Sequence, residues 1–204
     1  MMNESMLLIN FVYVIAAVLF IFGLKLLSHP STARKGNLLS ALAMLVAVIA
    51  TLLDNNILSF ELIALCVVLG SFIGVYAAKK VEMTSMPELV SMFNGIGGLA
   101  SLAVAYAMIA GEQPLSVFIL TVSFFALLIG AITFSGSIIA WAKLSERMVG
   151  RPIVFKGQVI ANVLLIAAII ASGYFIVTQP EVMTWHVVAI VIALIMGVML
   201  VIPI

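Results

Sequence analysis

Residues 115–142 read LSVFILTVSFFALLIGAITFSGSIIAWA, an unbroken stretch without a single charged side chain. An α-helix needs about 20 apolar residues to cross the hydrocarbon core of a bilayer, so this stretch is long enough to span it. The strands of a membrane barrel would instead show segments of about ten residues with alternating hydrophobicity, and that pattern is missing here. The stretch therefore predicts a membrane-spanning helix.

Six further apolar runs lie on either side of this stretch. The seven together cover residues 7–27, 37–53, 57–78, 87–110, 115–142, 159–177 and 183–202. Most have the length that a membrane helix requires, and the second is the shortest. The breaks between them combine proline or glycine with solvated groups, as in Gly-Glu-Gln-Pro at 111–114. We expect an all-α fold, a polytopic transmembrane helix bundle of about seven spans in one transmembrane domain over 1–204.

The composition agrees with this fold class and excludes others. Of 204 residues, 65% are hydrophobic and 8% are charged, with a mean hydropathy of +1.36. Soluble domains are nearer 45–50% apolar and about 25% charged, so a soluble enzyme and a disordered tail are excluded. The net charge of +1 creates no global field that would attract nucleic acid.

The charges predict the orientation. Every cation lies in alternate loops: Lys25, Arg34, Lys35, Lys79, Lys80, Lys143, Arg147, Arg151 and Lys156. The opposite loops carry only the acidic residues Asp54, Glu61, Glu112 and Glu181. The positive-inside rule then places the N-terminus outside and the C-terminus inside. No basic residue precedes the first apolar run, so we interpret that run as a retained helix rather than a signal peptide.

Polar side chains inside the membrane carry the functional information, because each is costly there. In the run 87–110, one arc of about 140° holds Glu88, Ser91, Asn94, Gly98 and Ser101. Asn94 lies about 10 Å along the helix from Pro87 and is thus well inside the membrane. This face is either polar glue between packed helices or a solvated path for an ion or proton.

A second stripe lies on the run 115–142. Ser123, Gly130, Thr133 and Ser137 fall within about 80° of one another, and Ser135 and Gly136 are adjacent. Such hydroxyls often bond only to their own backbone one turn back. Because the two runs are joined by a short loop, we expect their helices to pack antiparallel and the two stripes to line one wet seam.

Other chemistry-bearing residues are few. The sequence has no phosphate loop, no Cys/His metal spacing and no nucleophile elbow, so we expect no catalytic, cofactor-binding or metal-binding residue in this chain. Cys66 is the single cysteine. His29 and His186 are interpreted as interfacial residues, the latter because it follows Trp185 near a membrane edge.

Several segments together resemble a known family. They are Met-Pro-Glu-Leu-Val-Ser-Met-Phe-Asn-Gly at 86–95, Gly-Ala-Ile-Thr-Phe-Ser-Gly-Ser at 130–137 with Ala-Lys-Leu at 142–144, Arg-Pro-Ile at 151–153, Gly-Gln at 157–158, and Gly-Leu-Lys at 23–25 followed by His-Pro-Ser-Thr-Ala-Arg at 29–34. The whole chain resembles the membrane domain of the β subunit of proton-translocating NAD(P) transhydrogenase. The first two segments are specific, because hydrophobic composition does not generate either of them.

The resemblance implies a membrane domain that couples transmembrane proton flow to hydride transfer between NAD(H) and NADP(H), which bind in attached soluble domains. It implies an α-subunit partner with an NAD(H)-binding domain, a homodimer of αβ units, and the inner (plasma) membrane of a bacterium rather than of a mitochondrion. The proton path implied by the family would include Asn94, Ser137 and Glu88, with Ser91 and Thr133 on the same stripes. Some members carry histidine at the position of Asn94. Asparagine does not titrate, so the proton-carrying group here is expected from the partner chain.

The resemblance also implies segments beyond residue 204. In the family a Gly-Gly-x-Asp-Met-Pro-type segment, two more helices and an NADP(H)-binding domain follow, so we expect this chain to be truncated relative to a full β subunit. Two alternatives remain open from the residues alone. One is a passive ion channel or secondary transporter subunit built on the same stripes, and the other is a scaffold whose Gly/Ser faces only pack helices.

Overall fold

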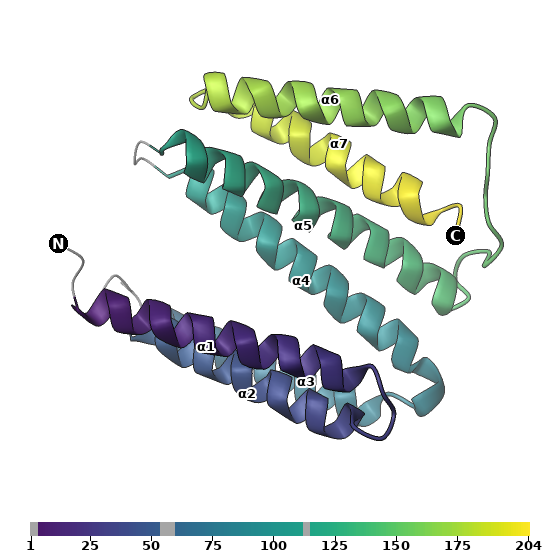
Figure 1. Ribbon diagram of the computed structural model, residues 1–204. Coiled ribbons are helices and arrows are strands. Elements are labelled where there is room, and N and C mark those ends of the chain that lie inside the picture. The colour runs from purple at the N-terminus through teal and green to yellow at the C-terminus, as the bar shows by residue number, and fades with distance from the viewer. Residues whose placement is uncertain (1–3, 54–59, 112–114) are drawn as a thin grey trace. The chain divides into compact units, whose positions relative to one another are not determined.

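The computed structural model describes residues 4–53, 60–111 and 115–204. Within these ranges the chain is helical and contains no strand (Figure 1). The elements are α1 (Glu4–Leu27), α2 (Ala33–Leu52), α3 (Phe60–Lys80), the short 3₁₀ helix η1 (Met83–Ser85), α4 (Met86–Ile109), α5 (Val117–Leu144), α6 (Gln158–Thr178) and α7 (Met183–Val201). Seven of them are long and apolar enough to cross a membrane, which confirms the predicted bundle of membrane helices.

The observed bounds differ from the predicted runs by a few residues. The second helix begins at Ala33 rather than at residue 37, because a solvated first turn that contains Arg34 and Lys35 precedes its apolar part. It reaches 20 residues, enough for a span. The predicted start of the third run, 57–59, lies outside the described residues. With 28 residues α5 is about 42 Å long, more than the hydrocarbon core of about 30 Å.

The chain divides into two compact units, residues 1–72 and 73–204, and the division falls within α3. The first unit is built on an antiparallel hairpin of α1 and α2. The two helices approach closely where Gly23 faces Gly36: a Cβ on Gly36 would lie 2.7 Å from the Gly23 carbonyl oxygen. At the other end of the hairpin, the hydroxyls of Tyr13 and Thr51 are 2.8 Å apart.

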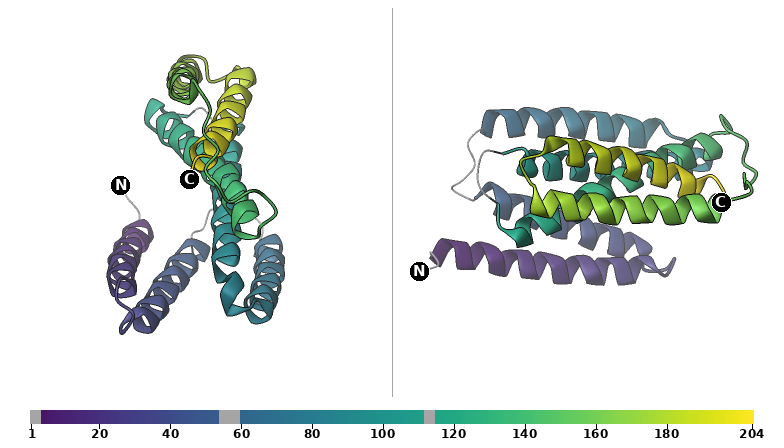
Figure 2. Two further views of the ribbon diagram at one scale, coloured as in Figure 1. Left: turned by 90° about the vertical axis from the view of Figure 1, so that its right-hand side faces the viewer. Right: turned by 90° about the horizontal axis from the view of Figure 1, so that it is seen from above.

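The second unit is organised around α5, which packs against α4 on one side and against α7 on another, while α6 covers α7. Both views of Figure 2 show α6 (green) beside α7 (yellow). The interior of this unit contains fully buried side chains from three helices, among them Leu127, Ile176 and Ala193. These side chains form one apolar cluster, which fixes α5 between its neighbours.

His186, interpreted from the sequence as an interfacial residue, lies in the first turn of α7. Its side chain is fully buried against the other helices, so it does not face outward from the chain. Its neighbour Trp185 stacks instead on Phe175 of α6, with ring centroids 4.2 Å apart. Because consecutive helical residues point about 100° apart, the amphipathic tryptophan and the buried histidine face different surroundings.

Candidate functional site: the α4–α5 seam

The two polar stripes meet across the seam between α4 and α5. Asn94 Nδ2 donates to Ser137 Oγ at 2.8 Å, and Ser91 Oγ donates to the Ser137 carbonyl oxygen at 2.8 Å. Ser137 is 7% exposed, Ser91 is half-buried, and Asn94 is exposed. Three side chains singled out by the sequence therefore form one hydrogen-bonded group.

Small residues allow this contact, because they let the two backbones approach closely. A Cβ on Gly98 would lie 2.8 Å from both the Gly130 carbonyl oxygen and the Phe134 amide nitrogen. A Cβ on Gly130 would lie 2.6 Å from the amide nitrogen of Leu102. One turn along the seam from these contacts, Asn94 and Ser137 are brought within hydrogen-bond distance.

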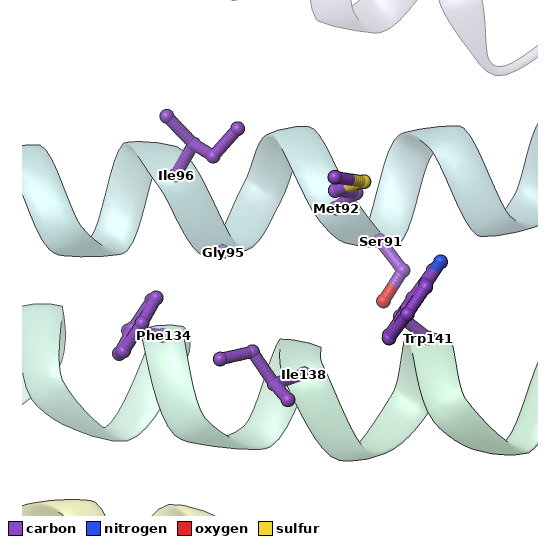
Figure 3. A pocket seen from close by; sticks show the side chains of 7 residues that line it. All are labelled: Ser91, Met92, Gly95, Ile96, Phe134, Ile138 and Trp141. Carbon is purple, nitrogen blue, oxygen red and sulfur yellow. The ribbon is translucent and has the colours of Figure 1, made fainter. Parts of the chain in front are cut away.

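A pocket of about 250 Å³ opens beside this group, between the same two helices (Figure 3). Ser91, Met92, Gly95, Ile96, Phe134, Ile138 and Trp141 line it. In Figure 3 the Ser91 hydroxyl points from α4 toward the α5 side of the pocket, near the Trp141 ring. At about 30 Å³ per water molecule the volume has room for several waters, although its walls are mostly carbon.

The remaining members of the predicted proton path lie near this group. Thr133 is half-buried on α5, and its Cβ would lie 2.9 Å from a Cβ on Gly98, so it lies at the seam. Glu88 is half-buried in the first turn of α4, where the helix dipole favours an anion. Lys80, on the preceding helix α3, donates to the Tyr76 hydroxyl at 3.0 Å.

The outer parts of the two stripes are not brought together at this point. Ser101 is exposed on α4, and Ser123 is buried well along α5 from Ser137. Ser135 donates to the Ala131 carbonyl oxygen at 3.1 Å, one turn back on its own helix. For Ser135 the structure thus supports the simple interpretation of a hydroxyl satisfied by its own backbone.

The sequence argument missed Trp141 as part of the pocket wall. Trp141 is one turn after Ser137 on the same face of α5, so the helical spacing did carry this signal. Its indole also lies under the guanidinium of Arg147, whose Cζ is 4.7 Å from the ring centroid. Searched over the described residues, the chain shows no group of three or more His, Cys, Asp or Glu side chains that could hold a metal ion.

Asn94 and Ser137 can orient hydrogen bonds, but neither side chain can hold an extra proton. An asparagine amide has two N–H donors and an accepting oxygen, and a serine hydroxyl has one donor and accepts as well. Because Ser137 Oγ accepts from Asn94, its own proton remains available to a water or to another acceptor. Neither side chain titrates near neutral pH, so any charge that crosses here must be held by another group.

Comparison with known proteins agrees with the family resemblance seen in the sequence. The family model described as NAD(P) transhydrogenase beta subunit matches residues 9–204. The chain belongs to the NAD(P) transhydrogenase β-subunit family. Two curated relatives named NAD(P) transhydrogenase subunit beta, both from Rhodospirillum rubrum, are each 36% identical over 154 residues, which is 72% of this chain and 33% of the relative.

The matched residues extend over the seven membrane helices in the described part of the chain, apart from the first residues of α1, and include the sequence segments that carry the resemblance. The chain spans about a third of the length of these relatives. It is a multi-pass membrane member of the β-subunit family, and the seam between α4 and α5 lies within the matched residues.

Proposed function

We propose that the α4–α5 seam is the β-subunit part of a transmembrane proton path, coupled to hydride transfer between NAD(H) and NADP(H) in attached soluble domains. The observation that carries this proposal is the 2.8 Å hydrogen bond between Asn94 and Ser137. Asn94 lies about 12 Å along α4 from Met86, and Ser137 lies about 10 Å along α5 from Leu144, so the bond joins the apolar parts of both helices. Membership of the β-subunit family supports the link to nucleotide chemistry.

In this proposal the chain positions the proton and a partner supplies the group that carries it. Ser91 is the hydroxyl residue of the pocket wall. The Asn94–Ser137 pair beside the pocket orients water, and Thr133 adds a hydroxyl further along the seam. A protonatable side chain from a helix of the partner α subunit would face Asn94 from the exposed side of α4. Glu88, in the first turn of α4, would serve as an entrance or exit group for the proton.

The surrounding assembly follows from the same proposal. The cation-bearing loops face the inside of the cell, so the N-terminus lies outside and the C-terminus inside. The partners are the α subunit, an NADP(H)-binding domain on the inside face, the lipid bilayer and a second αβ unit, with no nucleic acid. The chain forms a single transmembrane domain in a bacterial inner membrane and itself contacts neither nucleotide.

The experiment is to replace Asn94 in the full-length β subunit, assembled with its α partner and reconstituted in lipid vesicles. Asn94→Leu removes the donor to Ser137 together with the rest of the Asn94 side-chain amide, and keeps a side chain of similar size. We expect it to abolish NADP(H)-dependent proton movement. Thr121→Val is the matched control, because the Thr121 hydroxyl donates only within its own helix, to the Val117 carbonyl oxygen at 2.7 Å, in the described part of the chain.

The same measurement separates this proposal from its alternatives. A scaffold predicts that Asn94→Leu lowers the amount of folded complex while proton movement per folded complex is unchanged. A passive channel or transporter predicts proton or ion movement in the wild type without nucleotide. Unchanged pumping by a well-folded Asn94→Leu complex would rule out a role for the Asn94–Ser137 pair in the path.

A further inference from the structure

The end of α7 is held by a lysine from α5. Lys143 Nζ donates to the carbonyl oxygens of Ile202 at 2.5 Å and Val201 at 3.3 Å. The last four carbonyls of a helix have no partner within it, and they form the negative end of its dipole. A half-buried ammonium at this place satisfies the carbonyls and the dipole together.

Two more donors reach the same turn from the segment between α5 and α6. The Ile153 amide donates to the Ile202 carbonyl oxygen at 3.2 Å, and Gln158 Nε2 donates to the Met199 carbonyl oxygen at 3.4 Å. Lys143, Ile153 and Gln158 belong to the three separate sequence segments 142–144, 151–153 and 157–158. The fold thus brings three short motifs together at one helix end, which we call the α7 clamp.

The clamped end of α7 packs tightly on α5. A Cβ on Gly136 would lie 3.1 Å from Val201 Cγ2 and 3.3 Å from the Gly197 carbonyl oxygen. A Cβ on Gly197 would clash with the Ser135 hydroxyl and with the backbone of Ile132. Since little free space separates the two helices, a shift of the last turns of α7 must move this part of α5.

This part of α5 also carries Ser137, the acceptor of the hydrogen bond from Asn94. Gly136 faces α7, while the next residue, Ser137, faces α4 and accepts from Asn94. Lys143 lies six residues further on, about 9 Å along the same helix. One short stretch of α5 therefore contacts the end of α7 on one side and Asn94 on the other.

We propose that Lys143 is a positioning residue, which ties the end of α7 to α5 so that movement of this end changes the geometry of the Asn94–Ser137 pair. The proposal rests on the proposed function of that pair. In this proposal the α7 clamp transmits a movement of the C-terminal end of α7, through α5, to the hydrogen bond between Asn94 and Ser137. A lysine that only capped a helix would stabilise the fold without affecting Asn94.

The test compares Lys143→Met with Lys143→Arg in the full-length β subunit assembled with its α partner. Methionine keeps the length of the side chain and removes the three donors, whereas arginine keeps the charge and can still donate. Lys156→Met is the control, because Lys156 is an exposed cation in the nearby segment between α5 and α6. Should the methionine variant fail to fold, Lys143→Gln, which is shorter and uncharged, replaces it.

The first readout is the side-chain amide signal of Asn94 in ¹⁵N solid-state NMR, assigned as the signal lost in Asn94→Leu. We expect Lys143→Met to move or split this signal, and Lys143→Arg and Lys156→Met to leave it in place. This readout needs no transport. An unmoved signal in the folded Lys143→Met or Lys143→Gln complex overturns the inference.

The second readout is the stimulation of hydride transfer by an imposed proton gradient. We expect Lys143→Met to reduce this stimulation at least about five-fold, in the range of typical coupling between two sites, with restoration in Lys143→Arg. An equal loss of the basal and the stimulated rates would indicate a purely structural role and overturn the inference. If wild-type complex shows no stimulation, the proposed function fails, and the NMR signal still decides whether Lys143 positions Asn94.

Discussion

The close approach of α4 and α5 makes a quantitative prediction for two adjacent glycines. A Cβ on Gly98 would lie 2.8–2.9 Å from three atoms of α5, two of them backbone atoms that cannot move aside. A Cβ on Gly97 would meet no atom of the described residues within 4 Å. Alanine at either position gains the same helix propensity, about 1 kcal/mol over glycine. Comparing the two variants therefore isolates the cost of the contact.

The expected difference follows from the distances. Ordinary van der Waals contact begins at 3.4 Å, so Gly98→Ala must separate the helices locally by about 0.6 Å. Overpacking of this kind costs about 1–3 kcal/mol. If the helices separate as rigid bodies, the bond from Asn94 to Ser137 would lengthen from 2.8 Å to about 3.4 Å, beyond the usual range for N–H···O bonds.

The assay is unfolding of the β subunit in lipid–detergent mixtures by increasing SDS. Tryptophan fluorescence is a suitable signal, because Trp141 and Trp185, the two tryptophans of this chain, both lie in residues 73–204 with the seam. We expect Gly98→Ala to be less stable than Gly97→Ala by about 1–3 kcal/mol. Gly98→Ala should also lose gradient-driven turnover, while Gly97→Ala should keep it. Equal stability of the two variants would refute the argument from backbone contact.

Two further predictions use the same unfolding assay. Gly157 caps the start of α6 at φ 91°, and Glu146 follows α5 at φ 56°, both in the left-handed region. Gly157→Ala should therefore lose about 1 kcal/mol of stability, and Glu146→Gly should gain about 0.5–1 kcal/mol. Effects of the opposite sign would contradict the backbone argument. His186 is fully buried, and neither ring nitrogen has a partner among the described residues. His186→Leu should therefore be neutral or stabilising by up to about 1 kcal/mol, whereas Leu127→Ala should lose about 2–5 kcal/mol of stability. A large loss in His186→Leu would show that the imidazole has a partner.

The membrane helices were predictable because the length of an apolar run depends on the bilayer and not on the rest of the fold. The error at the start of α2 has a local cause. Arg34 and Lys35 lie in the first helical turn, and hydropathy does not distinguish a solvated helical turn from a loop. The orientation of the termini stays a prediction, because it depends on the membrane potential and on insertion rather than on contacts within the chain.

The two polar helix faces of the site were predictable from the sequence, but the hydrogen bond between Asn94 and Ser137 was not. Helical spacing places Asn94 and Ser137 on their stripes, yet it does not give the register of one helix against the other. That register is set where Gly98 meets Gly130, a tertiary contact with no signal in a single sequence. The burial of His186 was missed for a related reason, since the sequence does not show that α6 covers this end of α7, where Trp185 stacks on Phe175.

The exposure of Asn94 helps to decide between polar glue and a proton path. A bond that only joined two helices would be strongest with both partners buried, because a polar amide facing hydrocarbon is costly. Ser137 is buried, but Asn94 is exposed and has donor and acceptor capacity beyond the single hydrogen bond that the described residues show. In a bilayer this capacity must meet water or a polar group of a neighbouring chain. Both of these occupants suit a path that is completed on assembly, whereas glue within this chain would need neither.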